Sequence, residues 1–156
     1  MTVNEGMRTG DPRPTASSIS VSSRMSKQRR RDTAPELMVR RLLFRRGIRY
    51  RVDAKPEPDI RCRADILWRG HRLLVFIDGC FWHGCPIHAT RPKANAEWWA
   101  QKLDGNVRRD RRIDAELAAR GWTVLRFWEH EDPTVVADAI CEQLNEIRPR
   151  CRDASV

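Results

Sequence analysis

The twelve residues DGCFWHGCPIHA, at positions 78 to 89, place two cysteines and two histidines beside a phenylalanine and a tryptophan. Thiolates and imidazoles are ligands that zinc prefers, and Cys80, Cys85 and His88 lie close enough in sequence to bind one ion. A structural zinc site needs a tetrahedral set, and His130, which follows an apolar segment, is our candidate for the fourth ligand. The alternative is a loop in which buried free cysteines and a surface histidine have no metal.

His83 is the donor that this ligand set leaves over. An imidazole titrates near neutral pH, so this side chain could compete as a ligand or act as an acid or base. The five cysteines of the chain are odd in number and mostly far apart, so a disulfide framework is not expected. Metal binding is the better use for the clustered pair.

Apolar segments that precede these donors are predicted to be strands. Residues 64–68 (ADILW) and 72–78 (RLLVFID) form a hairpin through the turn at Arg69 and Gly70, and the second strand is apolar enough to be buried. Residues 122–129 (WTVLRFWE) are predicted to be a further buried strand. Two of these strands end at the candidate metal ligands.

A first helix is predicted where order begins. Asp32 or Thr33 can cap it, Pro35 suits its first turn, and the amphipathic pattern ends before Gly47. We expect the preceding tail, residues 1–24, to be disordered, because it is rich in Ser, Thr, Gly and Pro.

Two more helices are predicted, over residues 95–119, with a break at Gly105 as an option, and over residues 133–147. Helices interleaved with strands around a small sheet indicate one α/β or α+β domain, spanning residues 25–148. Residues 149–156 are expected to be a flexible tail.

The charge of the chain points to a polyanionic partner. Thirty Lys and Arg against twenty-one Asp and Glu give a formal net charge of +9, with a pI near 10.2, so nucleic acid is the leading partner. No window approaches the roughly 20 apolar residues of a membrane span, and the N-terminus lacks the apolar run of a signal peptide. We therefore expect a cytoplasmic, nucleoid-associated protein.

Several strings together resemble the very short patch repair (Vsr) endonuclease family. They are RMSKQRRRDTAPE, RADI, FIDGCFWHGCP, AEWWAQKLDGNVRRDRR and GWTVLRFWEHE, in family order from about Met25 to His130. The resemblance implies a restriction-endonuclease-like core of the PD-(D/E)xK type, with a central mixed β-sheet flanked by helices and a structural zinc site. It also implies a bacterial enzyme that nicks DNA 5′ of the T in T:G mismatches left by deamination of 5-methylcytosine, with Mg²⁺ for chemistry.

The resemblance also implies catalytic residues. Asp65, in RADI, matches the family's magnesium-binding aspartate, a hard oxygen ligand, and Ile77 stands where the ligand is a backbone carbonyl. His83 matches the general base, and Asp110 matches the carboxylate that holds the other nitrogen of that imidazole. Glu36 matches an acid of the first helix near the metal.

DNA-contacting residues are implied in the same way. Phe81 and Trp82 match an aromatic wedge that enters the base stack at the mismatch, and Met25 matches an apolar residue that enters with the N-terminal segment. Lys102 and Asn106 match residues that read the mismatched pair. The arginines expected to contact phosphate are Arg108, Arg109, Arg111 and Arg112.

This chain departs from the family pattern at two places. Relatives carry a run of histidines after the tryptophan, where this chain has His83-Gly84-Cys85-Pro86, so the implied zinc ligands become those proposed above. Relatives can also have a histidine at Asp78, where an acid could add metal affinity or alter how the scissile phosphate is held.

We expect a monomer that acts on double-stranded DNA containing a T:G mismatch, with a functional link to a DNA cytosine-5 methyltransferase and to repair proteins. Two alternatives stay open: a nuclease of the same fold with another DNA target, and a zinc-stabilised DNA-binding module without catalysis. Asp65, His83 and Asp110 occurring together favour an enzyme.

Overall fold

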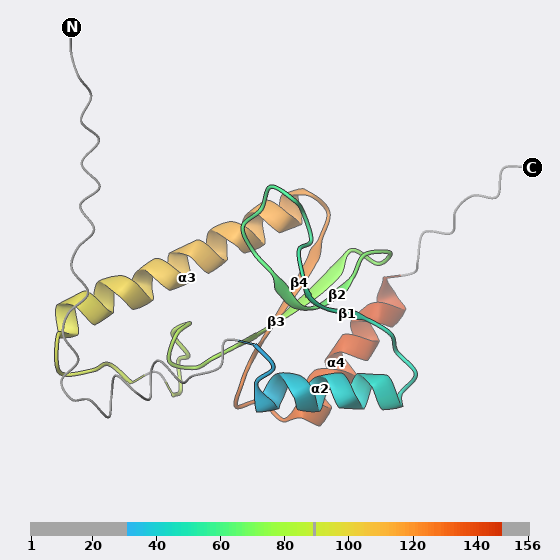
Figure 1. Ribbon diagram of the computed structural model, residues 1–156, viewed down its shortest axis with the longest axis horizontal. Coiled ribbons are helices and arrows are strands. Elements are labelled where there is room, and N and C mark those ends of the chain that lie inside the picture. Colours follow the sequence, from blue (N-terminus) through green and yellow to red (C-terminus); the bar gives the residue numbers. More distant parts are fainter. Residues whose placement is uncertain (1–30, 89, 148–156) are drawn as a thin grey trace, which may run out of the picture.

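The computed structural model describes residues 31–88 and 90–147. The predictions for Met25 and for the two tails fall outside these residues. The described elements are α2 (Ala34–Arg45), β1 (Arg51–Ala54), β2 (Ala64–Trp68), β3 (Leu73–Asp78), α3 (Ala96–Ala119), β4 (Thr123–Trp128) and α4 (Pro133–Glu146), as Figure 1 shows. Within the described ranges, none of the helices has both the length and the apolar composition needed to cross a membrane.

The strands form a mixed sheet in the order β1-β2-β3-β4. The pairs β1–β2 and β2–β3 are antiparallel, whereas β3 and β4 are parallel. The predicted hairpin and the expected mixed sheet with flanking helices are therefore confirmed. Strand β1 was not predicted, because its four residues, RVDA, show no apolar run. Two of them are exposed and two are half-buried.

The prediction that the strand at residues 122–129 is buried was wrong for most of its length. Every residue of β4 is half-buried, and only Trp122, just before it, is buried, with 6% of its surface exposed. The reason is the strand order: β4 is at the sheet edge and has a neighbour on one side only. Apolar composition predicts a strand but not its place in the sheet.

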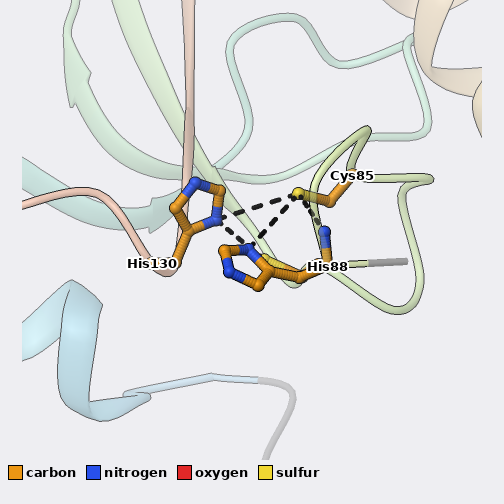
Figure 2. Close-up of side chains that lie close together, drawn as sticks. Cys85, His88 and His130 are labelled. Atoms are coloured by element: carbon orange, nitrogen blue, oxygen red, sulfur yellow. Dashed lines mark hydrogen bonds between the residues drawn. The ribbon is translucent and has the colours of Figure 1, made fainter. Parts of the chain in front are cut away.

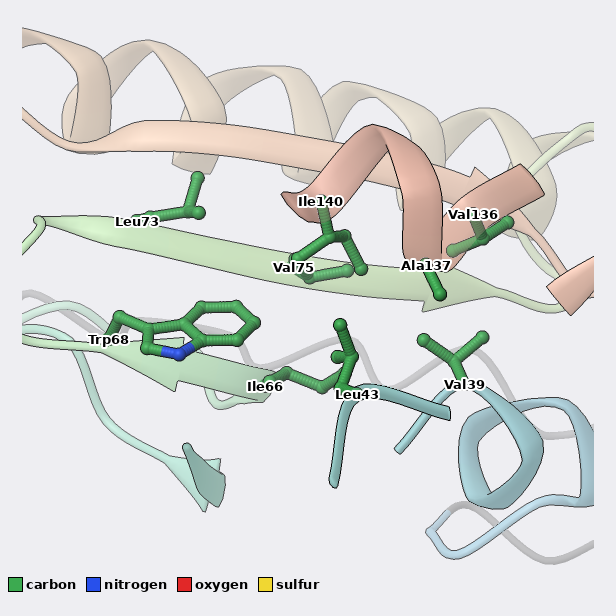
Figure 3. Packing of buried hydrophobic residues seen from close by; sticks show 9 residues of the cluster. All are labelled: Val39, Leu43, Ile66, Trp68, Leu73, Val75, Val136, Ala137 and Ile140. Atoms are coloured by element: carbon green, nitrogen blue, oxygen red, sulfur yellow. The ribbon is translucent and has the colours of Figure 1, made fainter. Parts of the chain in front are cut away.

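Helices cover both faces of the sheet, and successive residues of β3 point alternately to each face. Leu73 and Val75 pack with residues of α2 and α4, whereas Leu74 and Phe76 pack with residues of α3. Figure 3 shows the first core, made of Val39, Leu43, Ile66, Trp68, Leu73, Val75, Val136, Ala137 and Ile140. Burial of these side chains holds the three layers together.

The helix boundaries largely follow the sequence signals. Thr33 is the N-cap of α2, Gly47 beyond its end has a φ of +79°, and α4 begins at Pro133 as predicted. The optional break at Gly105 does not occur, since α3 is continuous. A glycine costs a helix about 1 kcal/mol relative to alanine, and burial of Leu103 on one side and Ile113 on the other outweighs this cost.

Candidate active site and metal centre

The four predicted zinc ligands come together at one end of the sheet, where β3 and β4 terminate. Cys80, Cys85 and His88 belong to the segment after β3, and His130 follows β4, the parallel neighbour of β3. Because parallel strands end at the same edge, the pairing brings His130 to the cysteines. All four ligand atoms lie within 4.8 Å of one another.

Individual distances describe a compact donor set. The Sγ of Cys80 is 3.1 Å from Nδ1 of His130, and the Sγ of Cys85 is 3.9 Å from Nδ1 of His88 and 3.8 Å from Nδ1 of His130. Figure 2 shows Cys85, His88 and His130 pointing toward one another. Both cysteines are buried. Two thiols and two imidazoles could hold a zinc ion in a tetrahedral set.

The loop between these cysteines is tightly turned. The backbone N–H of His83 donates to the carbonyl of Gly79 at 3.2 Å, and that of Cys85 donates to the carbonyl of Cys80 at 3.1 Å. Gly84 has a φ of +72°, and a Cβ there would come within 3.1 Å of Val107 on α3. The turn therefore requires glycine at this position.

His83 and Asp110, 27 positions apart, lie in direct contact. Nδ1 of His83 is 2.6 Å from Oδ2 of Asp110, and it is 3.7 Å from Oδ1 of Asp78. Burial lowers the pKa of His83, but the hydrogen bond with Asp110 and the charges of the two aspartates outweigh this effect and raise the pKa above its ordinary value. The imidazole is thus well placed to accept a proton.

Asp65 lies at the start of β2, which is antiparallel to β3, so it reaches the same edge of the sheet. Its Oδ2 accepts a hydrogen bond from the backbone N–H of Ile77 at 2.7 Å. Burial, together with the charges of Glu36 and Asp78, raises the pKa of Asp65 to about 7. A buried carboxylate beside other acids is a site where a bound cation would be stabilised.

Glu36 is held at the N-terminus of α2. Its carboxylate accepts hydrogen bonds from the backbone N–H of Asp32 and from Oγ1 of Thr33, each at 2.9 Å. Arg40, one turn further on, approaches it at 3.8 Å. With only 5% of its surface exposed, Glu36 contributes a fixed negative charge on the Asp65 side of the site.

The two candidate wedge residues belong to a larger aromatic group. Phe81 and Trp82 contact each other with ring centroids 4.9 Å apart, and both contact Trp99 of α3, at 5.5 and 5.9 Å. Trp98 contacts Trp99 in turn. The two α3 tryptophans were missed by the sequence reasoning. Their signal is spacing, since Trp99, Lys102 and Asn106 repeat at helical intervals on one face.

Asn106 directly contacts the segment from Gly79 to His88, called here the aromatic loop because it carries Phe81 and Trp82. Its Nδ2 donates to the backbone carbonyl of Trp82 at 3.1 Å. Helix α3 therefore holds the loop that carries Phe81 and Trp82. Lys102 is exposed on the same helix. The arginines expected to contact phosphate are all exposed, namely Arg108, Arg109, Arg111 and Arg112.

Arg126, on β4, is a site residue that the sequence reasoning also missed. It donates to both oxygens of Asp78, at 2.9 and 2.8 Å, and to both oxygens of Asp114, at 2.8 and 2.9 Å. Asp78, whose metal affinity was an open question, therefore has an arginine as its partner. With His83 and Asp110 these residues line a cleft of about 260 Å³ between α3 and the end of the sheet.

Comparison with known proteins identifies the family. The family model for DNA mismatch endonuclease Vsr matches residues 17–88. Type II nicking enzyme V.NaeI of Lentzea aerocolonigenes is 40% identical over 128 residues, covering 81% of this chain and 77% of that protein. Type II nicking enzyme V.NmeAIP of Neisseria meningitidis is 36% identical over 132 residues, covering 83% of this chain and 90% of that protein.

DNA mismatch endonuclease Vsr of Escherichia coli is 34% identical over 120 residues, 74% of this chain and 75% of that protein. These similarities agree with the motifs in the sequence. The chain therefore belongs to the Vsr family of DNA mismatch endonucleases.

Proposed function

We propose that this endonuclease nicks double-stranded DNA on the 5′ side of the mispaired T in T:G mismatches that arise from deamination of 5-methylcytosine. The observation that carries the proposal is the contact between His83 and Asp110, 2.6 Å long, at the sheet edge that also holds Asp65. A restriction-endonuclease-like core of the PD-(D/E)xK type is the proposed fold, with Asp65 of β2 and Asp78 of β3 as the acids that its strands present.

Magnesium is the proposed catalytic metal, with Asp65 and the backbone carbonyl of Ile77 as ligands. The donor chemistry fits, since the Asp65 carboxylate is a hard oxygen ligand already held against the Ile77 peptide. Glu36 would add negative charge from α2. Bound there, Mg²⁺ would stabilise the charge that develops on the phosphate during hydrolysis.

His83 is the proposed general base. With its Nδ1 hydrogen donated to Asp110, the lone pair of the imidazole is on Nε2, which can take a proton from the water that attacks phosphorus. Asp110 keeps the ring in this tautomer and orientation. The cleft beside the pair supplies space for the reacting water and phosphate.

Zinc is the proposed structural metal. Cys80, Cys85, His88 and His130 fit it by donor chemistry and by their proximity. Such an ion would join the segment after β3 to the end of β4, and so would hold the aromatic loop rigidly at the edge of the sheet. Its function would be structural, since four protein ligands complete a tetrahedral set.

Mismatch recognition is assigned to the aromatic group and to the neighbouring face of α3. Phe81 and Trp82, supported by Trp99, would enter the base stack, and unstacking costs least where pairing is already faulty. Lys102 and Asn106 are the proposed base-reading residues, and Met25 would enter from the N-terminal segment. Arg109 and its exposed neighbours would contact phosphate.

The test is strand-resolved nicking of a T:G duplex beside its T:A and C:G counterparts, in several sequence contexts and with Mg²⁺ or EDTA. Nicking 5′ of the T, confined to the mismatch and to Mg²⁺, is expected. Cleavage of fully paired duplexes would support the nuclease with another target, and binding without cleavage would support the non-catalytic module. A monomeric state and a link to a cytosine-5 methyltransferase remain part of the proposal.

A further inference from the structure

The guanidinium of Arg126 lies between carboxylates of two elements. One side donates to both oxygens of Asp78, at the end of β3, and the other side donates to both oxygens of Asp114 on α3. The ring of Phe76 lies beneath it, 4.3 Å from Cζ. All three nitrogens of the side chain therefore donate to carboxylates, and these contacts hold the guanidinium in a fixed position.

Asp78 is also a neighbour of His83. Its Oδ1 is 3.7 Å from Nδ1 of the imidazole. The same nitrogen is 2.6 Å from Oδ2 of Asp110. Nδ1 carries one hydrogen and can make one strong hydrogen bond. The two carboxylates are therefore alternative partners for the same ring nitrogen, and a small rotation of the ring would exchange one for the other.

Asp78 has little contact with bulk water, because only 7% of its surface is exposed. A buried carboxylate without a partner is costly, so an unpaired Asp78 would take the nearest donor within reach. In this cleft the donors next to it are Arg126 and His83. Whether Asp78 competes for the imidazole depends on Arg126.

We propose that Arg126 is a positioning residue for His83, because it binds both oxygens of Asp78 and so leaves Asp110 as the partner of the imidazole. The inference rests on the proposed function, in which His83 must present Nε2 to the attacking water. Arg126 also lies 3.9 Å from Oδ1 of Asp110, so it faces both carboxylates that flank the ring. It acts through these side chains, since its guanidinium nitrogens donate to Asp78 and Asp114.

The experiment compares single-turnover nicking by the wild type, Arg126→Met and the double variant Asp78→Asn/Arg126→Met. Arg126→Met should lower the nicking rate constant about tenfold or more with DNA affinity within about twofold, because the loss concerns the chemical step. The double variant should recover most of that loss, since asparagine carries no charge to compete for Nδ1. A double variant as slow as Arg126→Met would overturn the proposal.

Arg120→Met is the matched control. Arg120 also bridges two acids, since it donates to both oxygens of Asp59 and to Glu116, but it lies at the end of α3, away from the cleft. Its removal should leave the nicking rate unchanged. An equal fall in both arginine variants would indicate a general loss of stability and would overturn the assignment.

Two further measurements keep the test decisive if Arg126→Met does not fold. Asp114→Asn removes the charge from the α3 half of the bridge but keeps the Asp78 contact, so its nicking rate should fall by less than the roughly tenfold loss expected for Arg126→Met. A loss as large as tenfold there would mean that Arg126 merely pins α3 to β4. The Nδ1 proton resonance of His83, assigned by its absence in His83→Gln, should persist in Asp114→Asn; its disappearance would also contradict the proposal.

Failure of the proposed function and failure of the role of Arg126 would give different results. A wild type that nicks no duplex would refute the nuclease assignment, whereas a wild type that nicks while Arg126→Met nicks equally fast would refute only the role of Arg126. The Nδ1 resonance reports the contact between His83 and Asp110 without any substrate.

Discussion

At the scale of single residues, the site separates groups that would act on the phosphate from groups that orient them. In the proposed function, Asp65 and His83 belong to the first kind, and Asp110 and Arg126 belong to the second. In that function, Asp110 acts through its contact with His83, and Arg126 acts through its contacts with Asp78 and Asp114. Substitutions in the two kinds of residue should therefore differ in severity.

Asp65→Asn and His83→Gln should each abolish nicking while T:G duplex binding stays within about tenfold, since each change removes chemistry more than DNA contact. Gel-shift titration and single-turnover nicking of the same preparations measure the two quantities. His71→Gln, which changes a histidine in the turn before β3, should leave both unchanged. Full activity in either site variant would contradict the catalytic assignment.

At the scale of elements, the segment from Gly79 to His88 combines three tasks. It carries three candidate zinc ligands, the aromatic pair and the candidate base. It docks on α3 through Asn106, Val107 and Asp110. Metal binding and the loop turn should therefore both affect catalysis.

Protein purified without added metal should contain about one zinc per chain, and Cys85→Ser should lose it together with thermal stability, because structural zinc binding is coupled to folding. Elemental analysis and a melting curve measure these outcomes. Cys62→Ser, which changes a half-buried cysteine outside the cluster, is the control and should keep its zinc. A stable, zinc-free wild type would exclude the structural zinc site.

Gly84→Ala should reduce nicking strongly, by about tenfold or more. The substitution places a Cβ 3.1 Å from Val107 in a residue whose φ is +72°, so the loop must shift between His83 and Cys85. The matched control is Gly70→Ala, because a Cβ at Gly70 would meet nothing within 4 Å. Wild-type nicking by Gly84→Ala would show that the loop tolerates the shift.

At the scale of the whole molecule, the net charge of +9 and the exposed arginines of α3 should set general DNA affinity, whereas the aromatic group should set discrimination. Phosphate contacts release counterions irrespective of sequence, so they affect paired and mismatched duplexes alike. Stacking depends on how easily the base pairs separate. The two contributions can be measured separately.

Trp82→Ala should lower the preference for T:G over C:G duplexes, on the scale of roughly 1–3 kcal/mol for a lost stacking contact. Arg109→Ala should weaken binding to both duplexes equally and reduce the salt slope by about one. Titrations of both duplexes at several salt concentrations distinguish the two signatures. If Trp82→Ala keeps the wild-type preference, its contacts with Phe81 and Trp99 are packing contacts only.

Much of the architecture was predictable from the sequence. Apolar periodicity and end signals predicted α2, the β2–β3 hairpin, α3, β4 and α4, because those patterns are local. Strand β1 was missed for lack of an apolar run. The continuity of α3 at Gly105 and the half-burial of β4 were not predictable, since both depend on what packs against the element.

By itself, the sequence determined the donor types available and, through its motifs, the Vsr family. Only the tertiary structure decided which side chains meet: the parallel pairing of β3 with β4 brings His130 to the cysteines, and the crossing of α3 places Asp114 against Arg126. The physical reason is that periodicity reports which face of an element is buried, whereas an ion pair depends on the relative placement of two elements. In a chain with thirty basic and twenty-one acidic residues, residue type leaves many pairings open, and packing selects the Asp78–Arg126–Asp114 bridge.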